Sequence, residues 1–449
     1  KKAELFIVNR FLEAGIEPGN NGDYLQNYDV ITNEFNKVKL ESSSFDSIIG
    51  EDIFTTVFKK DTLVSFKNVV FAGYGITSGE FDDYAMISVK DKLVFMFEEN
   101  PVDKDGKPIL SKEEIKKWYN NDREEYAKKL GAKGVVFVSS TYASTKNYFA
   151  RQIRSRDISL PDTSTVYPSF YISQGLFYDL FECDSIMSKN YILKRKTSKL
   201  LKKFDRSMDL TFSISSNRQV LTASNVMGKI EGSDPDAPWI VLTAHYDHEG
   251  VRGDDIYNGA DDNASGTSSV LEIAHAFAKA KNDGEKFTNN LLFLLVSGEE
   301  KGLLGSKYYV SNPTIALSKT MCNLNIDMIG RTDTKHDSTD NYVYIIGADR
   351  ISPELHTINE EMNTLYTHLT LDYRYNDPND RNRFYERSDH YNFAKNGIPV
   401  IFYYNGTHAD YHKPSDTEDK IQYNLLVERA RLVFHTAWYL AKKEAKMLN

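Results

Sequence analysis

Cysteine is scarce in this sequence, and its scarcity excludes one class of protein. Only Cys183 and Cys322 occur in 449 residues, too few for the disulfide framework of a small secreted domain. The two residues fall in segments that we assign to different domains. We therefore expect two free, buried thiols rather than one bridge.

Long apolar runs and surplus positive charge are missing as well. The longest apolar run, Leu291–Val296, is long enough for a strand but far too short for a membrane span. The formal net charge of −9 does not suit nucleic acid or anionic lipid as a partner. What is present, 41% hydrophobic and 27% charged residues, is typical of a globular chain with a large core. The length indicates two domains, and nothing in the sequence indicates an oligomeric state.

From about residue 208 onward, apolar runs of strand length alternate with segments of helical periodicity. We expect strands at residues 239–243, 290–296, 321–326, 342–346 and 399–404. We expect helices at residues 264–280, 303–310, 353–365 and 425–444, and an amino-terminal helix over residues 1–15. This alternation predicts an α/β fold, with a mostly parallel but mixed sheet covered by helices on both faces.

Between residues 45 and 203 the pattern is different. Strands are expected over residues 64–76 and 90–100, and a helix that runs on toward Gly131 is expected to begin at a Ser111 cap. No group of catalytic side chains occurs here. We predict an inserted β-rich α+β domain over residues 45–203, and a main domain built from residues 1–44 and 204–449.

Polar residues that can bind metal lie where the predicted strands and helices of the main domain meet. Five such junctions each carry a histidine or an acidic residue: His245, Asp262, Glu300, Asp327 and His412. In an open parallel sheet, functional sites lie beyond the carboxyl ends of the strands. We therefore expect these five side chains to converge at one edge of the sheet.

Histidine and carboxylate ligands without cysteine suit a hydrolytic zinc centre better than a structural one. If one carboxylate bridges, each of two ions receives three side chains and keeps room for water. Two alternatives stay open within this set. Asp261 competes with Asp262 for one ligand position, and His408 competes with His412 for another.

The segments around these residues resemble the motif series of the M28 zinc metallopeptidases, in family order. They are His245-x-Asp247, Gly-Ala-Asp-Asp262-Asn-x-Ser-Gly, Glu299-Glu300, Asn-x-Asp327-Met and Tyr411-His412-x-Pro-x-Asp-Thr. The resemblance implies two zinc ions bridged by Asp262, with His245 and Asp327 on one ion and Glu300 and His412 on the other. It also implies that Glu299 is the general base and that Tyr411 donates a hydrogen bond to the tetrahedral intermediate. The Asp247 carboxylate is implied to orient His245.

Three further expectations follow from resemblance. Arg387-Ser-Asp389-His390 is similar to a segment that lines the family's substrate pocket, which implies substrate-binding roles for Arg387 and Asp389; a helix-cap reading of this segment is equally open. The segments beginning at Phe71 and Gly131 resemble a protease-associated domain, an insertion that many such enzymes carry. The family's habit, together with the absence of an initial Met, implies an exported protein.

These observations predict a di-zinc aminopeptidase that removes amino-terminal residues from peptides. A carboxypeptidase of the same fold stays open, because a group of arginines could bind a terminal carboxylate: Arg374, Arg381, Arg383 and Arg387. A glutaminyl cyclase typically works with one zinc ion, so the full ligand set here speaks against that function. A receptor-like relative without activity would have lost metal ligands, and none is lost here.

Overall fold

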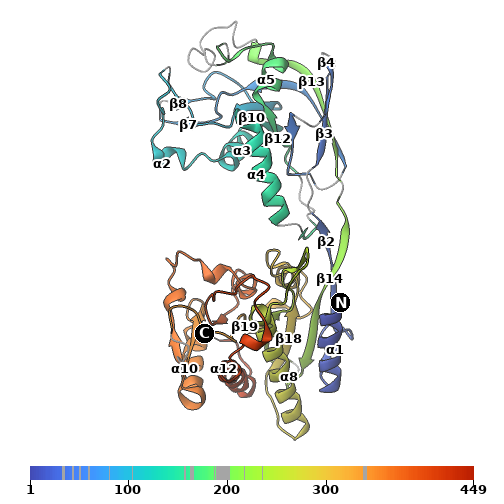
Figure 1. Ribbon diagram of the computed structural model, residues 1–449, viewed down its shortest axis with the longest axis vertical. Helices are drawn as coiled ribbons and strands as arrows, with labels where there is room; N and C mark the ends of the chain where they lie inside the picture. The colour runs from blue at the N-terminus through green and yellow to red at the C-terminus, as the bar shows by residue number, and fades with distance from the viewer. Residues whose placement is uncertain are drawn as a thin grey trace. The chain divides into compact units, whose positions relative to one another are not determined.

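The protein is described by a computed structural model. It covers residues 1–448 except 33–35, 43–44, 50–51, 59–60, 80, 104, 156–157, 162–165, 187, 189–202, 217, 235 and 337–340. The chain divides into two compact units, residues 1–30 with 221–449 and residues 31–220, and both termini lie in the first (Figure 1). The boundaries expected from the sequence, after residues 44 and 203, fall inside the second unit. The reason is that β3 (Lys37–Ser42) pairs with β13 (Asp205–Ser215), which places both segments in one sheet.

A mixed sheet forms the centre of the first unit. The strands that this unit contributes to the sheet are, in spatial order, β2 (Leu25–Thr32), β14 (Val220–Ile230), β18 (Asn290–Val296), β15 (Trp239–His245), β19 (Thr320–Ile326), β22 (Val400–Tyr404), β20 (Tyr342–Ile346) and β21 (Thr370–Asp372), and β1 (Glu17–Pro18) also pairs with β14. The neighbours from β18 to β22 run parallel, whereas β14 and β20 join them antiparallel. The carboxyl ends of four central strands therefore lie at one edge.

Helices cover both faces of this sheet, as the sequence predicts. Every residue of β18 is buried, and successive residues such as Phe293 and Leu294 belong to the cores on opposite faces. The first core also includes residues of α1 (Lys2–Glu13), α8 (Gly266–Asn282), α10 (Pro353–Met362) and α12 (Tyr423–Lys442). The second includes residues of α9 (Leu304–Ser311) and α11 (His390–Ala394). The predicted α/β class is confirmed.

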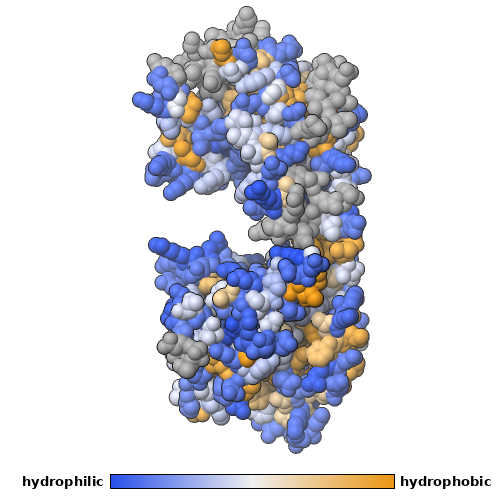
Figure 2. Space-filling view, viewed as in Figure 1, coloured by the Kyte–Doolittle hydropathy of each residue, from blue (hydrophilic) through white to orange (hydrophobic). Residues whose placement is uncertain are grey.

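Helix α1 leaves part of its apolar surface uncovered. Leu5, Phe6 and Leu12 are each more than half exposed, while Ile7 and Phe11 are buried in the core. Figure 2 shows apolar side chains gathered on the part of this unit where Figure 1 places α1. None of the helices within the described ranges combines the length and the apolar content needed to cross a bilayer.

The second unit is β-rich. Its main sheet has the order β4 (Phe45–Ile49), β3, β13, β6 (Thr62–Phe71), β9 (Leu93–Phe97), β10 (Gly134–Ser139), β12 (Ser169–Ser173) and β5 (Ile53–Phe54). Helices α2 (Lys112–Ile115), α3 (Asn120–Lys129), α4 (Tyr142–Ser155) and α5 (Gln174–Phe181) accompany it. Its resemblance to a protease-associated domain stays a prediction.

The single helix expected after Ser111 is two helices in the structure, α2 and α3. Ser111 caps α2 and forms a capping box with Glu114, as its sequence suggests. A new helix then begins, because the Asp122 carboxylate accepts a hydrogen bond from the Tyr119 amide. The buried Arg123 side chain also donates to the Trp118 carbonyl. Both cysteines are free as expected, but only Cys322 is buried and Cys183 is half-buried.

Candidate metal centre

The five predicted ligands lie together at the carboxyl edge of the central strands. His245 ends β15, Asp327 follows β19 directly, and Asp262 lies in the turn before α8. Nε2 of His245 is 3.3 Å from Oδ1 of Asp262 and 3.4 Å from Oδ1 of Asp327. Nε2 of His412 is 3.1 Å from Oδ2 of Asp262 and 3.2 Å from Oε2 of Glu300. Asp262 thus presents one oxygen to each of two histidine–carboxylate pairs.

These separations match those of ligands that share a zinc ion. Two ligands of a tetrahedral zinc, each about 2.0–2.1 Å from the ion, lie roughly 3.3 Å apart. Within the described part of the chain, His245 Nε2 and Asp262 Oδ2 make no hydrogen bond, although buried polar atoms are normally satisfied. The residues present therefore fit a divalent cation in each of two triads that share Asp262.

The charge of the site supports the same conclusion. The side chains of Asp262, Asp327 and Glu300 are only 5%, 10% and 4% exposed. Burying three carboxylates is costly unless positive charge neutralises them. Burial lowers the pKa of His412, but its interactions with the carboxylates of Asp262 and Glu300 outweigh burial and raise that pKa to about 9. The site thus attracts positive charge.

The turn that carries Asp262 is fixed by residues far away in the sequence. The Asp416 carboxylate accepts hydrogen bonds from the backbone amides of Asp261 and Asp262 at 3.0–3.2 Å. The Asn263 side chain donates to the Ile326 carbonyl and accepts from the Gly266 amide, each at 2.9 Å. A Cβ on Gly266 would lie 2.4 Å from Asn263 Oδ1, so this close approach requires glycine.

Asp327 is held by a chain of hydrogen bonds that the sequence reasoning did not foresee. The Ser388 hydroxyl donates to Asp327 Oδ2 at 2.6 Å and accepts from the Asn325 side chain at 2.8 Å. Asn325 Oδ1 in turn accepts from Thr243 at 2.7 Å. All four side chains are buried. The arrangement leaves Oδ1 of Asp327 directed at His245.

Glu299 lies beside the first triad. Its carboxylate is within 4.8 Å of ligand atoms of His245 and Asp327, but it forms none of the four short histidine contacts. Burial raises the pKa of the Glu299 carboxyl well above its ordinary value; His245 opposes this and Asp327 adds to it. A high pKa suits a group that must accept a proton and release it again.

The expected role of Asp247 needs a correction. His245 Nδ1 donates to the backbone carbonyl of Asp247 at 3.0 Å, whereas the Asp247 carboxylate is 3.8 Å away. That carboxylate accepts from the Glu299 amide at 3.2 Å. The main chain of Asp247 therefore orients His245, and its side chain positions Glu299.

A small pocket opens beside the triads. Of the two residues expected to bind substrate, Arg387 lines this pocket and Asp389 does not. The lining includes Asp262, Glu299 and Asp327, the side chains of Arg387 and Tyr411, and the apolar or aromatic Met328, Phe384, Phe402 and Tyr404. Nη2 of Arg387 is 3.5 Å from the Tyr411 hydroxyl, and burial raises the pKa of Tyr411, so the phenol stays a donor. Asp389 is fully buried, does not line the pocket and accepts from Ser306 at 2.5 Å. Asp389 thus lies outside the lining of this pocket, and its role in substrate binding stays a prediction.

Asp261 and His408, the alternative ligand candidates, lie next to each other. His408 Nε2 is 3.3 Å from Oδ2 of Asp261, and Oδ1 of Asp261 accepts from the Gly330 amide at 2.6 Å. Neither residue takes part in the four short histidine–carboxylate contacts that define the triads. Asp262 and His412, rather than Asp261 and His408, thus lie where the triads form.

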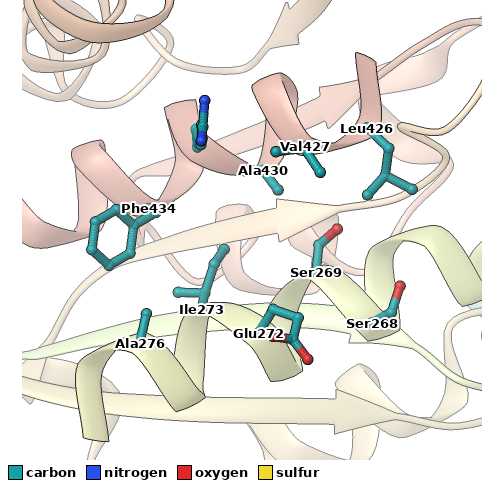
Figure 3. Close-up of a pocket in the computed structure, with 10 residues that line it drawn as sticks. Ser268, Ser269, Glu272, Ile273, Ala276, Leu426, Val427, Ala430 and Phe434 are labelled. Atoms are coloured by element: carbon teal, nitrogen blue, oxygen red, sulfur yellow. The ribbon is translucent and has the colours of Figure 1, made fainter. Parts of the chain in front are cut away.

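A larger cavity lies elsewhere in the first unit, between α8 and α12. It measures about 380 Å³, against about 30 Å³ for the pocket beside the triads. Figure 3 shows Ile273 of α8 and Leu426 and Phe434 of α12 lining it. Its lining contains no histidine and a single acidic residue, Glu272. Size alone therefore does not identify the reactive site.

Comparisons with known proteins give one family match and several named relatives. Residues 225–437 match the family model described as Peptidase family M28. Over 209 residues the chain is 32% identical to an Arthroderma otae protein named "Probable leucine aminopeptidase", covering 45% of this chain and 54% of that one. Over 273 residues it is 28% identical to a Pyrenophora tritici-repentis protein named "Probable zinc metalloprotease", covering 51% and 54%. The chain spans about half the length of these relatives.

Among the solved structures that align along the whole chain is the aminopeptidase from Aneurinibacillus sp. strain AM-1, at 18% identity and a TM-score of 0.47, covering 100% of this chain and 89% of that one.

Proposed function

We propose that the protein is a zinc aminopeptidase with two metal ions, in line with the match of residues 225–437 to the model described as Peptidase family M28. The observation that carries the proposal is the position of Asp262, which offers one carboxylate oxygen to each of two histidine–carboxylate pairs. His245 and Asp327 would hold one ion, and Glu300 and His412 the other. The names of the two relatives, one an aminopeptidase and one a zinc protease, support the same class.

Zinc, when bound, supplies a Lewis acid that polarises a carbonyl and lets water lose its proton near neutral pH. Glu299 accepts the proton of the attacking water and later delivers it to the leaving amine. The Tyr411 hydroxyl donates to the oxygen that becomes negative in the transition state. Asp247 holds the backbone of Glu299 through the 3.2 Å hydrogen bond, so that the carboxylate stays directed at the triad.

The lining of the pocket also indicates which kind of substrate side chain it would accept. Its aromatic lining suits an apolar side chain. Its carboxylates, Asp262, Glu299 and Asp327, are already assigned to the metal ions and to proton transfer, so the choice of the amino-terminal end rests on the name of the aminopeptidase relative.

A carboxypeptidase is the second candidate, and Arg387 is the observation that favours it. Arg387 is exposed at the pocket and could bind a terminal carboxylate in bidentate fashion. Of the other arginines considered, Arg374 pairs with Asp372 and Arg383 with Glu386. Only Arg387 among the four lines the pocket.

Peptides blocked at one end separate these functions. An aminopeptidase cleaves peptides with a free amine whether their carboxyl end is free or amidated, and it leaves acetylated peptides intact. A carboxypeptidase shows the opposite preference, and a receptor-like protein cleaves neither. We expect the aminopeptidase pattern, loss of activity after chelation and recovery with added zinc. Cleavage that persists at full rate in excess chelator would refute the proposal.

A further inference from the structure

Arg387 is the only lysine, arginine or histidine among the described residues that line the pocket beside the triads. It lies between η5 (Phe384–Glu386) and α11, and its side chain is exposed. Its Nη2 is 3.5 Å from the Tyr411 hydroxyl, and its Cζ lies over the Phe384 ring, 5.0 Å from the centroid. Within the described part of the chain, the guanidinium forms no ion pair with a carboxylate. It can therefore bind a carboxylate of the substrate through two parallel hydrogen bonds.

The depth of the lining residues indicates which part of a peptide meets Arg387. The apolar and aromatic residues Met328, Phe384, Phe402 and Tyr404 are each at most 8% exposed, so they form the floor of the pocket. Arg387 is exposed and therefore lies at the opening. An apolar side chain of the terminal residue gains most by burial on the floor. The rest of the peptide then extends toward the opening and the guanidinium.

The distance from Arg387 to the reacting bond matches the length of one residue. In the proposed mechanism, the Tyr411 hydroxyl donates to the scissile carbonyl oxygen over about 2.7–3.1 Å. Because Nη2 of Arg387 is 3.5 Å from that hydroxyl, it lies within roughly 6.6 Å of the same oxygen. The carboxylate of a dipeptide is at most about 3.6 Å beyond the scissile carbonyl, and a charge-assisted contact spans about 2.8 Å. In an extended pentapeptide the carboxylate lies roughly 13 Å away, which is out of reach.

We propose that Arg387 binds the terminal carboxylate of a dipeptide, so that the enzyme hydrolyses dipeptides in preference to their amides and to long peptides. The inference rests on the proposed function, since cleavage after the amino-terminal residue places that carboxylate one residue from the scissile bond. Losing a hydrogen bond to a charged group typically weakens binding at least about tenfold. Because this contact does not involve the reacting atoms, it lowers KM rather than raising kcat. The arginine that favours a carboxypeptidase thus has a role in an aminopeptidase.

Two matched substrates, leucyl-alanine and leucyl-alanine amide, test the proposal through the release of leucine. We expect the wild-type kcat/KM to be about tenfold higher for the free dipeptide, mainly through a lower KM, and Arg387→Gln to reduce this ratio to about one. Arg387→Lys keeps the charge but not the paired hydrogen bonds, so it should keep part of the preference. The control is Arg381→Gln, which changes an exposed arginine outside the pocket lining and should keep the wild-type ratio. Because the ratio compares two substrates on one variant, a general loss of activity cancels.

The same assay separates the possible errors. A wild-type ratio below about threefold would refute the inference and leave the proposed function intact. Equal losses on both substrates in Arg387→Gln would also refute it, and would indicate that the guanidinium acts on the scissile carbonyl beside Tyr411. Leucyl-aspartyl amide carries its only carboxylate in a side chain, and faster cleavage of it than of leucyl-alanine would overturn the terminal carboxylate in favour of an acidic second residue. Acetyl-leucyl-alanine cleaved faster than leucyl-alanine would refute the proposed function and the inference with it.

Discussion

Replacing Glu299 with glutamine should remove turnover while keeping the metal ions. The substitution preserves the size of the side chain and removes only its ability to accept a proton. Glu299 takes part in none of the four short histidine contacts that define the triads. Its backbone amide, which binds Asp247 at 3.2 Å, is unchanged by the substitution. Zinc content should therefore stay at two ions per chain.

The expected loss follows from what else could replace the base. General bases typically contribute about 10²- to 10⁴-fold. Near the pocket, the carboxylates of Asp262, Asp327 and Glu300 face histidines, and the Asp247 carboxylate is engaged by the Glu299 amide. With no spare carboxylate among these four, we expect kcat to fall by about 10⁴-fold. At about 1.4 kcal/mol per tenfold change, this is roughly 5 kcal/mol of lost transition-state stabilisation.

The assay is steady-state hydrolysis of aminoacyl-anilides, with zinc measured in the same samples. Glu361→Gln, which changes an exposed glutamate of α10 in the same way, is the control and should behave as wild type. A Glu299→Gln enzyme with kcat within about tenfold of wild type would refute Glu299 as the base. Loss of zinc from that variant would instead make Glu299 a ligand.

Four further substitutions test other parts of the site and the fold. His412→Ala should reduce zinc content from two ions to one, whereas His408→Ala should leave two; metal analysis showing the reverse would transfer the ligand role to His408. Ser388→Ala removes the 2.6 Å hydrogen bond to Asp327 and should weaken zinc binding about 10- to 100-fold, and unchanged affinity in a chelator titration would contradict this. Leu291→Ala opens a cavity at a fully buried position. Denaturant unfolding should show that it lowers the free energy of unfolding by about 2–5 kcal/mol. A change under about 1 kcal/mol would show that the core closes around the cavity.

Buried strands made much of the fold predictable. The run Leu291–Val296 is apolar because helices cover both faces of the sheet, and β18 (Asn290–Val296) has the bounds that the sequence predicts. Strands β13 and β14 were not foreseen. In β13 buried and more exposed residues largely alternate, and polar residues break up the apolar positions of both strands, so neither forms the continuous apolar run that marks a central strand.

The convergence of the five predicted ligands could be predicted because each lies at a strand end or in a loop that follows a strand. The residues that orient the ligands could not, since their contacts join distant parts of the chain. Ser388 reaches Asp327 across 61 positions, and Asp416 reaches Asp261 across 155. Asp247 shows a second limit. The sequence places Asp247 two positions beyond His245. Only the folded structure shows that its backbone carbonyl, rather than its carboxylate, contacts the ring.

The central claim is that Asp262 joins two zinc ions, and a crystal structure of zinc-loaded protein with data collected at the zinc absorption edge tests it most directly. The account predicts two anomalous peaks, one ligated by His245 and Asp327, one by Glu300 and His412, and both by Asp262. Peaks at Asp261 and His408, a single peak, or none at this edge of the sheet would contradict it.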